Sequence, residues 1–296
     1  MTKKQPFIWA GLTIFIKIVR ILPHKAACAV GAVLGSVVCF FSHAKVTAAA
    51  GRCAVALQIS KSRALAIVKA SYRHFGTDAV EFARLPKMVM KIDKLVTTYG
   101  EDNLKKAIAK GKGVILTTAH IGNWEYAAAW LAQHGYPIYA LGADQRDERI
   151  TELIKNTRIS YGAKALGKST DLKKMIRALQ STGIIAIPID QDAKLAGITS
   201  PFLGYPASTP TGIARLAGRF GCPVVPLFCI RNADGLTFDM HLLPAMQGRD
   251  GNQYGADLQE SIDDCNSIIS EWITKYPEQW LWLYPRWESV ERGMFK

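Results

Sequence analysis

The stretch "GVILTTAHIGNWEYAAAW" (residues 113–130) contains the change of pattern that indicates the fold. Its first half is a short apolar run rich in β-branched side chains, which predicts a buried strand. Its second half opens the segment "EYAAAWLAQHG" (125–135), which has the composition of a helix closed by a glycine. His120 ends the strand-like run and Glu125 opens the helix, so an imidazole and a carboxylate stand at a strand-to-helix junction.

The same alternation continues through the rest of the chain. Further strands are predicted at 136–142, 184–190, 222–230 and 236–244, and further helices at 148–162, 170–183, 208–221 and 255–275, the third of these with Thr209 as its cap and Pro210 at its first position. Alternating strands and helices indicate an α/β fold with a largely parallel central sheet flanked by helices. Residues 46–110 are helical and basic in pattern, so we expect one α/β domain over 46–296 with a helical lead-in at 46–110.

The positive charge of the chain is concentrated near its N-terminus. The whole chain carries a net charge of +13, and residues 1–112 contain 19 of the 37 Lys and Arg residues but only 5 of the 24 Asp and Glu residues. Such an asymmetry indicates an anionic partner, either a nucleic acid or a membrane surface. Two strongly apolar stretches (7–23 and 26–41) lie in the same part, and no basic–aromatic interleaving or recognition motif is present. We therefore expect an anionic membrane surface as the partner and no nucleic acid.

The first apolar stretch is expected to be a helix with one polar stripe. Within 7–23 the residues Ala10, Thr13, Lys17 and Arg20 recur at intervals of three, four and three, and most of the other side chains are large and apolar. A helix of this length covers about 25 Å, less than the roughly 30 Å of hydrocarbon in a bilayer. It would lie in the interface, or span with its cations reaching the headgroups; the ordinary alternative is a core helix with a polar edge. We expect residues 1–45 to anchor the protein to the membrane.

The cysteines give no sign of a metal site or of disulfides. None of the six forms a CxxC pair or has metal-ligand spacing, and most stand among apolar residues: Cys28, Cys39, Cys53, Cys222, Cys229 and Cys265. They are interpreted as small buried hydrophobic residues in a reducing compartment. No GxSxG motif is present and no cysteine lies near a candidate base, so the sequence offers no covalent nucleophile.

His120 and Glu125 suggest general-base chemistry. Ligands of doubly wound sheets bind beyond the carboxyl ends of the strands, where both residues should lie. If the turn containing Gly122 brings the carboxylate to one ring nitrogen, Glu125 fixes the tautomer and the other nitrogen takes a proton from a substrate hydroxyl or water. The alternative is a loop histidine beside a helix-start glutamate, which the helix dipole favours. Spacing alone leaves both interpretations open.

A wider set of motifs resembles a known family. "HIGNWE" (120–125) is similar to the His-x4-Asp/Glu motif of the glycerolipid and lysophospholipid acyltransferase superfamily. The complete set resembles the late acyltransferases of lipid A biosynthesis, and its other members are "IKNTR" (154–158), "PIDQD" (188–192), "FLGYPASTPTGIARLAGRFGCPVVPLFCIR" (202–231) and "PEQWLWLYPRW" (277–287). The chain departs from the pattern at Tyr284 and Pro285, where the family commonly has histidine and arginine.

The resemblance implies a reaction and a set of site residues. It implies transfer of a fatty acyl chain from an acyl carrier protein thioester, or from CoA, to a hydroxyl of a lipid A precursor. The resemblance implies that the reaction takes place at the cytoplasmic face of the inner membrane. Since the sequence offers no covalent nucleophile or metal-ligand spacing, we expect no acyl-enzyme, metal or organic cofactor. His120 would be the base and Glu125 its partner, while Arg158 and Asp190 would arrange the site and the substrate. The ordinary alternatives are a helix C-terminal cation for Arg158 and a strand-end cap for Asp190.

Several other interpretations stay open at this point. The acceptor could be another glycolipid or a lysophospholipid, or water, which would make the protein a thioesterase that uses the same pair. A protein without catalysis, such as a basic scaffold at a membrane surface, is the alternative of a different class. The residues Trp280, Trp282 and Trp287 are expected to be core or interfacial anchors.

Overall fold

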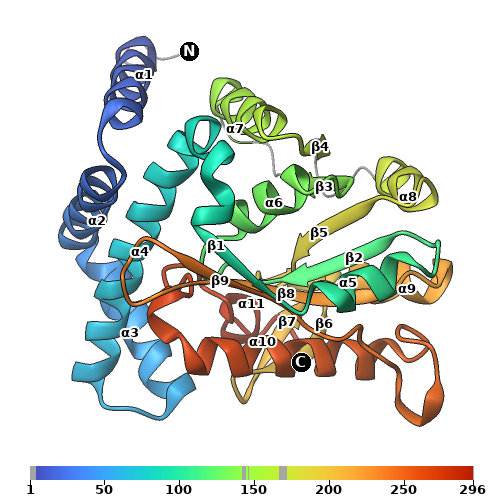
Figure 1. Cartoon of the computed structure of the whole chain (residues 1–296). Coiled ribbons are helices and arrows are strands. Elements are labelled where there is room, and N and C mark those ends of the chain that lie inside the picture. Colours follow the sequence, from blue (N-terminus) through green and yellow to red (C-terminus); the bar gives the residue numbers. More distant parts are fainter. Residues whose placement is uncertain (1–4, 142–144, 146, 167–171, 296) are drawn as a thin grey trace.

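A seven-stranded sheet runs through the centre of the molecule in the computed structural model, which describes residues 5–141, 145, 147–166 and 172–295 (Figure 1). The strand order is β1-β9-β8-β2-β5-β3-β4, and every neighbouring pair is parallel except β8–β9. The strands are β1 (Val96–Tyr99), β2 (Val114–Thr118), β3 (Ile138–Leu141), β4 (Lys164–Leu166), β5 (Ile184–Pro188), β8 (Val224–Arg231) and β9 (Phe238–Leu242). This arrangement confirms the predicted α/β fold with a largely parallel sheet.

Helices cover both faces of the sheet, so its central strands are buried on both sides. In β2, Leu116 belongs to the apolar cluster that includes residues of α5 and α6, whereas Ile115 belongs to the cluster that includes residues of α8, α9 and α10. This alternation follows from the two-residue period of a strand and explains why the sequence of β2 is apolar throughout. The helices are α1 (Gln5–Ile21), α2 (His24–Phe41), α3 (His43–Leu57), α4 (Lys61–Met88), α5 (Glu101–Ile108), α6 (Trp124–Gln133), α7 (Glu148–Ser160), α8 (Leu172–Gln180), α9 (Gly212–Phe220), α10 (Leu258–Lys275) and α11 (Glu288–Glu291).

The sequence prediction missed the short strands and placed one helix start wrongly. β1 (VTTY) and β4 (KAL) lie at the two edges of the sheet and are short, and neither has the apolar run that identified the similarly short β3 (IYAL). Thr209, predicted to cap a helix, instead ends β7 (Tyr205–Thr209), which pairs antiparallel with β6 (Ile198–Phe202). The Thr209 hydroxyl accepts hydrogen bonds from Asn266 and Arg286, so long-range contacts keep it in the hairpin. α9 begins three residues later, at Gly212.

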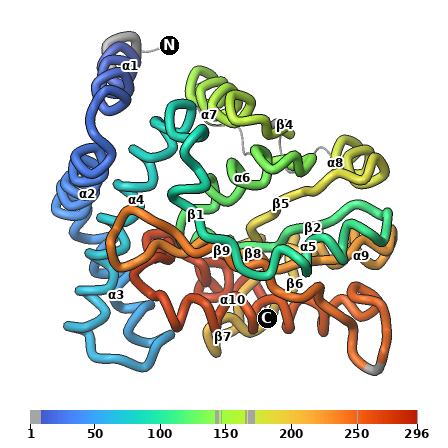
Figure 2. Tube along the Cα trace, in the orientation of Figure 1, coloured from blue at the N-terminus to red at the C-terminus, as the bar shows by residue number. Residues whose placement is uncertain are grey.

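The N-terminal helices form a column beside the sheet, and α4 packs against each of them (Figure 2). α2 lies against α4 at backbone distance, because both helices carry glycine where they meet. A Cβ atom added at Gly35 would lie 2.2 Å from the carbonyl oxygen of Tyr72, and one added at Gly31 would lie 2.6 Å from that of Gly76. The division that we predicted at residue 45 falls within α3 and stays a prediction.

The outer side of α1 and α2 exposes large apolar residues. In α1, Ile16 and Val19 are buried. One side of this helix therefore packs against the rest of the protein, while the other side is exposed. The exposed apolar face, formed by the outward side chains of both helices, consists of Ile14, Ile18, Ile21, Val33, Leu34, Val37, Val38, Phe40 and Phe41. Within the part of the chain that the structure describes, α2 is the one helix long and apolar enough to cross a membrane, and 28% of its residues are buried. The start of the predicted helix at 170–183 lies outside the described residues.

The glycine contact between α2 and α4 predicts the effect of a large side chain. Gly35→Leu should lower the free energy of unfolding by about 1–3 kcal/mol, because the added atoms must push the two backbones apart. Gly51→Leu in α3 is the matched control, because a Cβ at Gly51 meets nothing within 4 Å. Thermal unfolding of both variants in detergent measures the difference, and equal midpoints would contradict the role of this contact.

Candidate active site

His120 and Asp190 meet because their strands are parallel neighbours. Thr118 and Pro188, the last residues of β2 and β5, are paired in register, and each of the two polar residues follows two positions later. Both side chains therefore emerge at the same edge of the sheet. The Nδ1 atom of His120 lies 2.7 Å from Oδ1 of Asp190, and the backbone N–H of His120 donates to Oδ2 at 2.8 Å.

The charges of the pair stabilise one another. Asp190 is 2% exposed, and burial alone would raise its pKa. The charge of protonated His120 and the hydrogen bonds from His120 and Trp280 outweigh burial, so the pKa of Asp190 lies below its usual value. Burial would likewise lower the pKa of His120, but the charge and hydrogen bond of Asp190, with a smaller effect of the Glu125 charge, raise it above 6.5.

This arrangement defines the tautomer of the imidazole. An ionised Asp190 only accepts hydrogen bonds, so Nδ1 of His120 must carry a proton and Nε2 of the neutral ring is free to accept one. Within residues 5–141 and the other described ranges, Nε2 of His120 has no hydrogen-bond partner. The ring of Trp124 contacts the imidazole edge-to-face at a centroid distance of 5.0 Å. The geometry is that of a base oriented by a carboxylate.

Glu125 is not the carboxylate that contacts the imidazole, contrary to our expectation. The predicted turn is present: Gly122 has φ +58°, and a Cβ there would lie 1.9 Å from the carbonyl oxygen of Cys229. Glu125, in the first turn of α6, instead pairs with Arg158, with Oε1 and Nη2 2.5 Å apart. Nε of Arg158 and the hydroxyl of Tyr161 also donate to Oε2 of Glu125, at 3.3 and 3.0 Å. A buried carboxylate requires a cation, and here Arg158 supplies it.

Arg158 joins the end of α7 to the start of α6. It lies in the last turn of α7, and its Nη1 also donates to the carbonyl oxygen of Leu141 at 3.0 Å. Burial would lower the pKa of Arg158, but the charge and hydrogen bonding of Glu125 outweigh burial and raise it. Arg158 and Glu125 both line the cavity described next, so the pair forms part of its wall. A direct part for either residue in the reaction stays a prediction.

A cavity of about 820 Å³ opens beside His120. Glu125 and Arg158 line it together with His120, and Asp190 is not among the described residues that do so, so the imidazole stands between Asp190 and the cavity. Most of the remaining lining is apolar and includes Phe75, Phe82, Ala128, Leu131, Ile138, Ala140, Met175, Ala186, Ile187, Ile213 and Leu227. A mainly apolar cavity whose lining also includes polar and charged side chains is typical of a site for an amphiphilic ligand.

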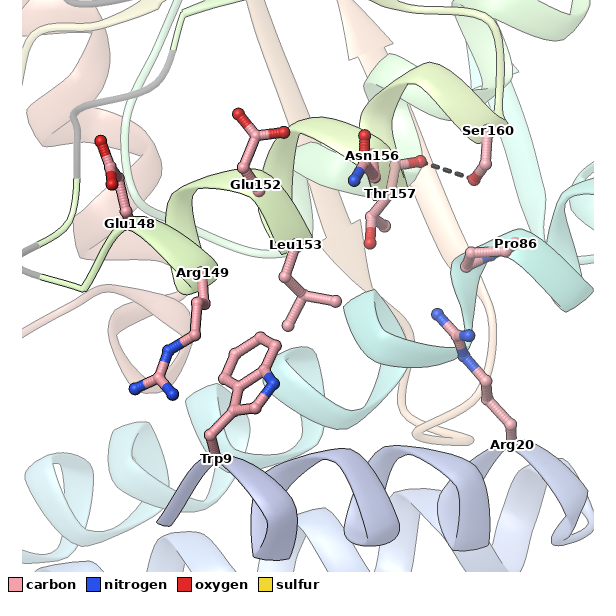
Figure 3. Close-up of a pocket in the computed structure, with 10 residues that line it drawn as sticks. All are labelled: Trp9, Arg20, Pro86, Glu148, Arg149, Glu152, Leu153, Asn156, Thr157 and Ser160. Atoms are coloured by element: carbon pink, nitrogen blue, oxygen red, sulfur yellow. Dashed lines mark hydrogen bonds between the residues drawn. The ribbon is translucent and has the colours of Figure 1, made fainter. Parts of the chain in front are cut away.

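A second cavity, of about 710 Å³, lies between α1 and α7 (Figure 3). Trp9 of α1 faces Arg149 and Leu153 of α7 across it, and Arg20 of α1 lies opposite Pro86 of α4. The one serine among its described lining residues, Ser160, donates its hydroxyl to the carbonyl oxygen of Thr157 at 2.7 Å. The described lining contains no histidine, and its two carboxylates, Glu148 and Glu152, are exposed. The cavity beside His120 is therefore the candidate active site.

One group of described residues has spacing suited to a metal ion: the donor atoms of His24, Cys28 and Glu81 lie within 4.8 Å of one another. Glu81 is fully buried, and both of its oxygens accept hydrogen bonds from the guanidinium of Arg231, at 2.8 and 2.5 Å. Asn123 donates to the same carboxylate at 2.9 Å. The charge of Glu81 is thus already neutralised by Arg231, so this donor set does not favour a cation.

Two features of the site were missed at the sequence level. The first is the bond from the indole N–H of Trp280 to Oδ2 of Asp190, 2.8 Å long. The second is the buried network in which Arg231, at the end of β8, binds Asp78 and Glu81 of α4. A signal for the second was available, since Asp78 and Glu81 are the acidic residues of an otherwise basic helix and lie three positions apart. No spacing rule connects Trp280 to Asp190.

The chain is similar to known acyltransferases. Residues 2–289 match the family described as bacterial lipid A biosynthesis acyltransferase. A phosphatidylinositol mannoside acyltransferase of Mycobacterium tuberculosis (strain CDC 1551 / Oshkosh) is 26% identical over 227 residues, which are 74% of this chain and 69% of the relative. The lipid A biosynthesis palmitoleoyltransferase of Escherichia coli K12 is 24% identical over 207 residues, 69% of this chain and 65% of the relative. The lauroyltransferase of the same organism is 23% identical over 214 residues, with the same coverage.

The match extends over almost the whole chain and includes the strand ends that carry His120 and Asp190. The chain therefore belongs to the bacterial lipid A biosynthesis acyltransferase family and is an acyltransferase of the lipid A and glycolipid type.

Proposed function

We propose that this enzyme transfers a fatty acyl chain from a thioester of acyl carrier protein, or of CoA, to a hydroxyl of a lipid A precursor, with His120 as the general base. The observation that carries the proposal is the His120–Asp190 pair at the wall of a mainly apolar cavity. The names of the E. coli relatives favour a lipid A acceptor. Those of the mycobacterial relatives favour another glycolipid as the second candidate.

The proposed reaction needs one base and no covalent intermediate. Nε2 of His120 takes the proton of the acceptor hydroxyl, and the oxygen of this hydroxyl attacks the carbonyl carbon of the thioester. A C–O bond forms, the C–S bond breaks, and the imidazolium returns its proton to the leaving thiolate. Asp190 stabilises the imidazolium between these two transfers, because its carboxylate stays ionised beside Nδ1. No step requires a metal or an organic cofactor.

The apolar part of the cavity suits the acyl chain. Residues from α6, β3, β5 and β8 line it, so a chain there would lie between α6 and the sheet. Each buried methylene contributes about 0.8 kcal/mol, which makes such a site selective for chain length.

We further propose that α1 and α2 attach the enzyme to the cytoplasmic face of the inner membrane. Their exposed apolar face and the positive charge of residues 1–112 together suit an anionic bilayer. The backbone contact of Gly31 and Gly35 with α4 supports a position in the interface, because α2 could not span the bilayer without leaving this contact. The acceptor lipid would then reach the site from the same surface.

The general-base role predicts the effect of removing the imidazole. His120→Ala should lower the rate of acyl transfer from acyl carrier protein thioester to a phosphorylated disaccharide lipid by about 10²–10⁴-fold. His43→Ala is the matched control, because His43 is exposed on α3. A His120→Ala enzyme as fast as the parent would refute the mechanism. Release of free fatty acid at the same rate with and without acceptor would identify a thioesterase instead.

The pH dependence of the rate follows from the His120–Asp190 pair. His120 is a base only when neutral, so kcat/KM should fall as the pH drops through its raised pKa, above 6.5. In Asp190→Asn the charge that raises this pKa is lost and the lowering by burial remains. The acid limb of the profile should therefore move to lower pH, with a reduced maximum. An unchanged acid limb in Asp190→Asn would show that the pair does not control the base.

Membrane attachment is measurable by flotation with vesicles. Phe40→Ser and Phe41→Ser should each weaken binding to anionic vesicles by about tenfold or more, because these rings are 78% and 80% exposed and would be buried in lipid. Met90→Ser, 84% exposed outside α1 and α2, is the control. Complete release of the parent by high salt would show purely electrostatic attachment and contradict the apolar contact.

A further inference from the structure

We propose that Trp280 is a positioning residue of the His120–Asp190 pair: its indole N–H orients the carboxylate, and its backbone holds the loop that carries His120. The sequence predicted Trp280 only as a core or interfacial anchor. The kinetic consequences of this inference rest on the proposed function, whereas its structural content does not.

The indole completes the hydrogen bonding of the Asp190 carboxylate. Oδ1 accepts from the His120 ring, and Oδ2 accepts from the His120 backbone and from Nε1 of Trp280, each at 2.8 Å. A carboxylate with three N–H donors stays ionised in a buried site. Without the indole, Oδ2 would keep one donor, and the carboxyl group could rotate away from Nδ1.

The backbone beside Trp280 holds the other member of the pair. Ile121 and Trp280 form an antiparallel bridge, and the N–H of Leu281 donates to the carbonyl oxygen of His120 at 3.1 Å. The N–H of Gly122 donates to the carbonyl oxygen of Gln279 at 3.0 Å. The segment 279–281 therefore contacts both His120 and Asp190, which the chain places 70 residues apart.

Trp280 is itself held in one orientation. It is 1% exposed, and its carbonyl oxygen accepts a hydrogen bond from Ser71 at 2.5 Å. Its ring packs against Phe202 and Trp282 at centroid distances of 5.6 and 4.6 Å. A donor fixed by packing on several sides fixes the direction of its hydrogen bond as well.

The same tail supplies two natural controls. Trp282 is also 1% exposed, but its indole N–H donates to the carbonyl oxygen of Pro277 at 2.8 Å. Trp287 is 6% exposed, and its indole nitrogen has no hydrogen-bond partner among the described residues. Replacing any of the three by phenylalanine removes the same group and a similar volume, yet only Trp280 donates to Asp190.

The first measurement is the titration of His120 by NMR in protein with labelled histidine rings. The chain contains six histidines, so the His120 signal is assigned by its loss in His120→Ala. Trp280→Phe should lower the pKa of His120, because the carboxylate that raises it is held less firmly. Trp282→Phe and Trp287→Phe should leave this pKa where it is in the parent.

The second measurement is the kinetics of acyl transfer. Trp280→Phe should lower kcat by about 10- to 100-fold with little change in KM, the size expected for a lost hydrogen bond to a charged group. Its acid limb should move to lower pH, and the two controls should keep the parent profile. In the background of Asp190→Ala the same substitution should cause no further loss, because the acceptor of the indole hydrogen bond is gone.

An unchanged pKa of His120 in Trp280→Phe, or the same shift in Trp282→Phe, would overturn the inference. A loss of activity without a pKa shift, accompanied by a fall in thermal stability larger than that of Trp282→Phe, would overturn it as well, since the residue would then be structural only. If the proposed function is wrong, the result is distinguishable, because His120→Ala would remain active. The NMR titration would still show whether Trp280→Phe changes the pKa of His120.

Discussion

The contact between Nδ1 of His120 and Oδ1 of Asp190 depends on the pairing of β2 with β5, and the site is organised around it. Parallel strands in register end at the same edge, so two polar residues at equal distances past their ends become neighbours. The pair is buried on the Asp190 side and borders the cavity on the His120 side. The charge of the Asp190 carboxylate is therefore stabilised inside the protein, while the imidazole of His120 can contact a ligand in the cavity.

Other buried charged side chains are also paired, because an unpaired buried charge is costly, and their ion pairs connect different helices and strands. Arg231 at the end of β8 binds Asp78 and Glu81 of α4, and Asn123, the N-cap of α6, donates to Glu81. Removing one partner from such a group leaves an uncompensated buried charge, which lowers the free energy of unfolding by about 3–5 kcal/mol. The network therefore ties the helix that carries the N-terminal column to the loop that follows His120.

The N-terminal helices combine two properties that seldom occur in a core helix. α2 approaches α4 closely enough to require glycine, yet it exposes Phe40 and Phe41 almost completely. Close packing on one side and an apolar outer side are consistent with a surface held against lipid by a rigid body.

The sequence by itself determined the α/β class, five strands of the sheet (β2, β3, β5, β8 and β9), the junction at His120 and the family, because apolar periods and local motifs are properties of short segments. It also identified Asp190, though not as the partner of the imidazole. Only the tertiary structure decided that Asp190 rather than Glu125 meets His120, that Glu125 pairs with Arg158, and that Trp280 reaches the carboxylate. These choices depend on which strands are neighbours and on how a distant tail returns to them. Strand order and long-range packing bring together residues 70 to 90 positions apart, and local spacing does not encode such contacts.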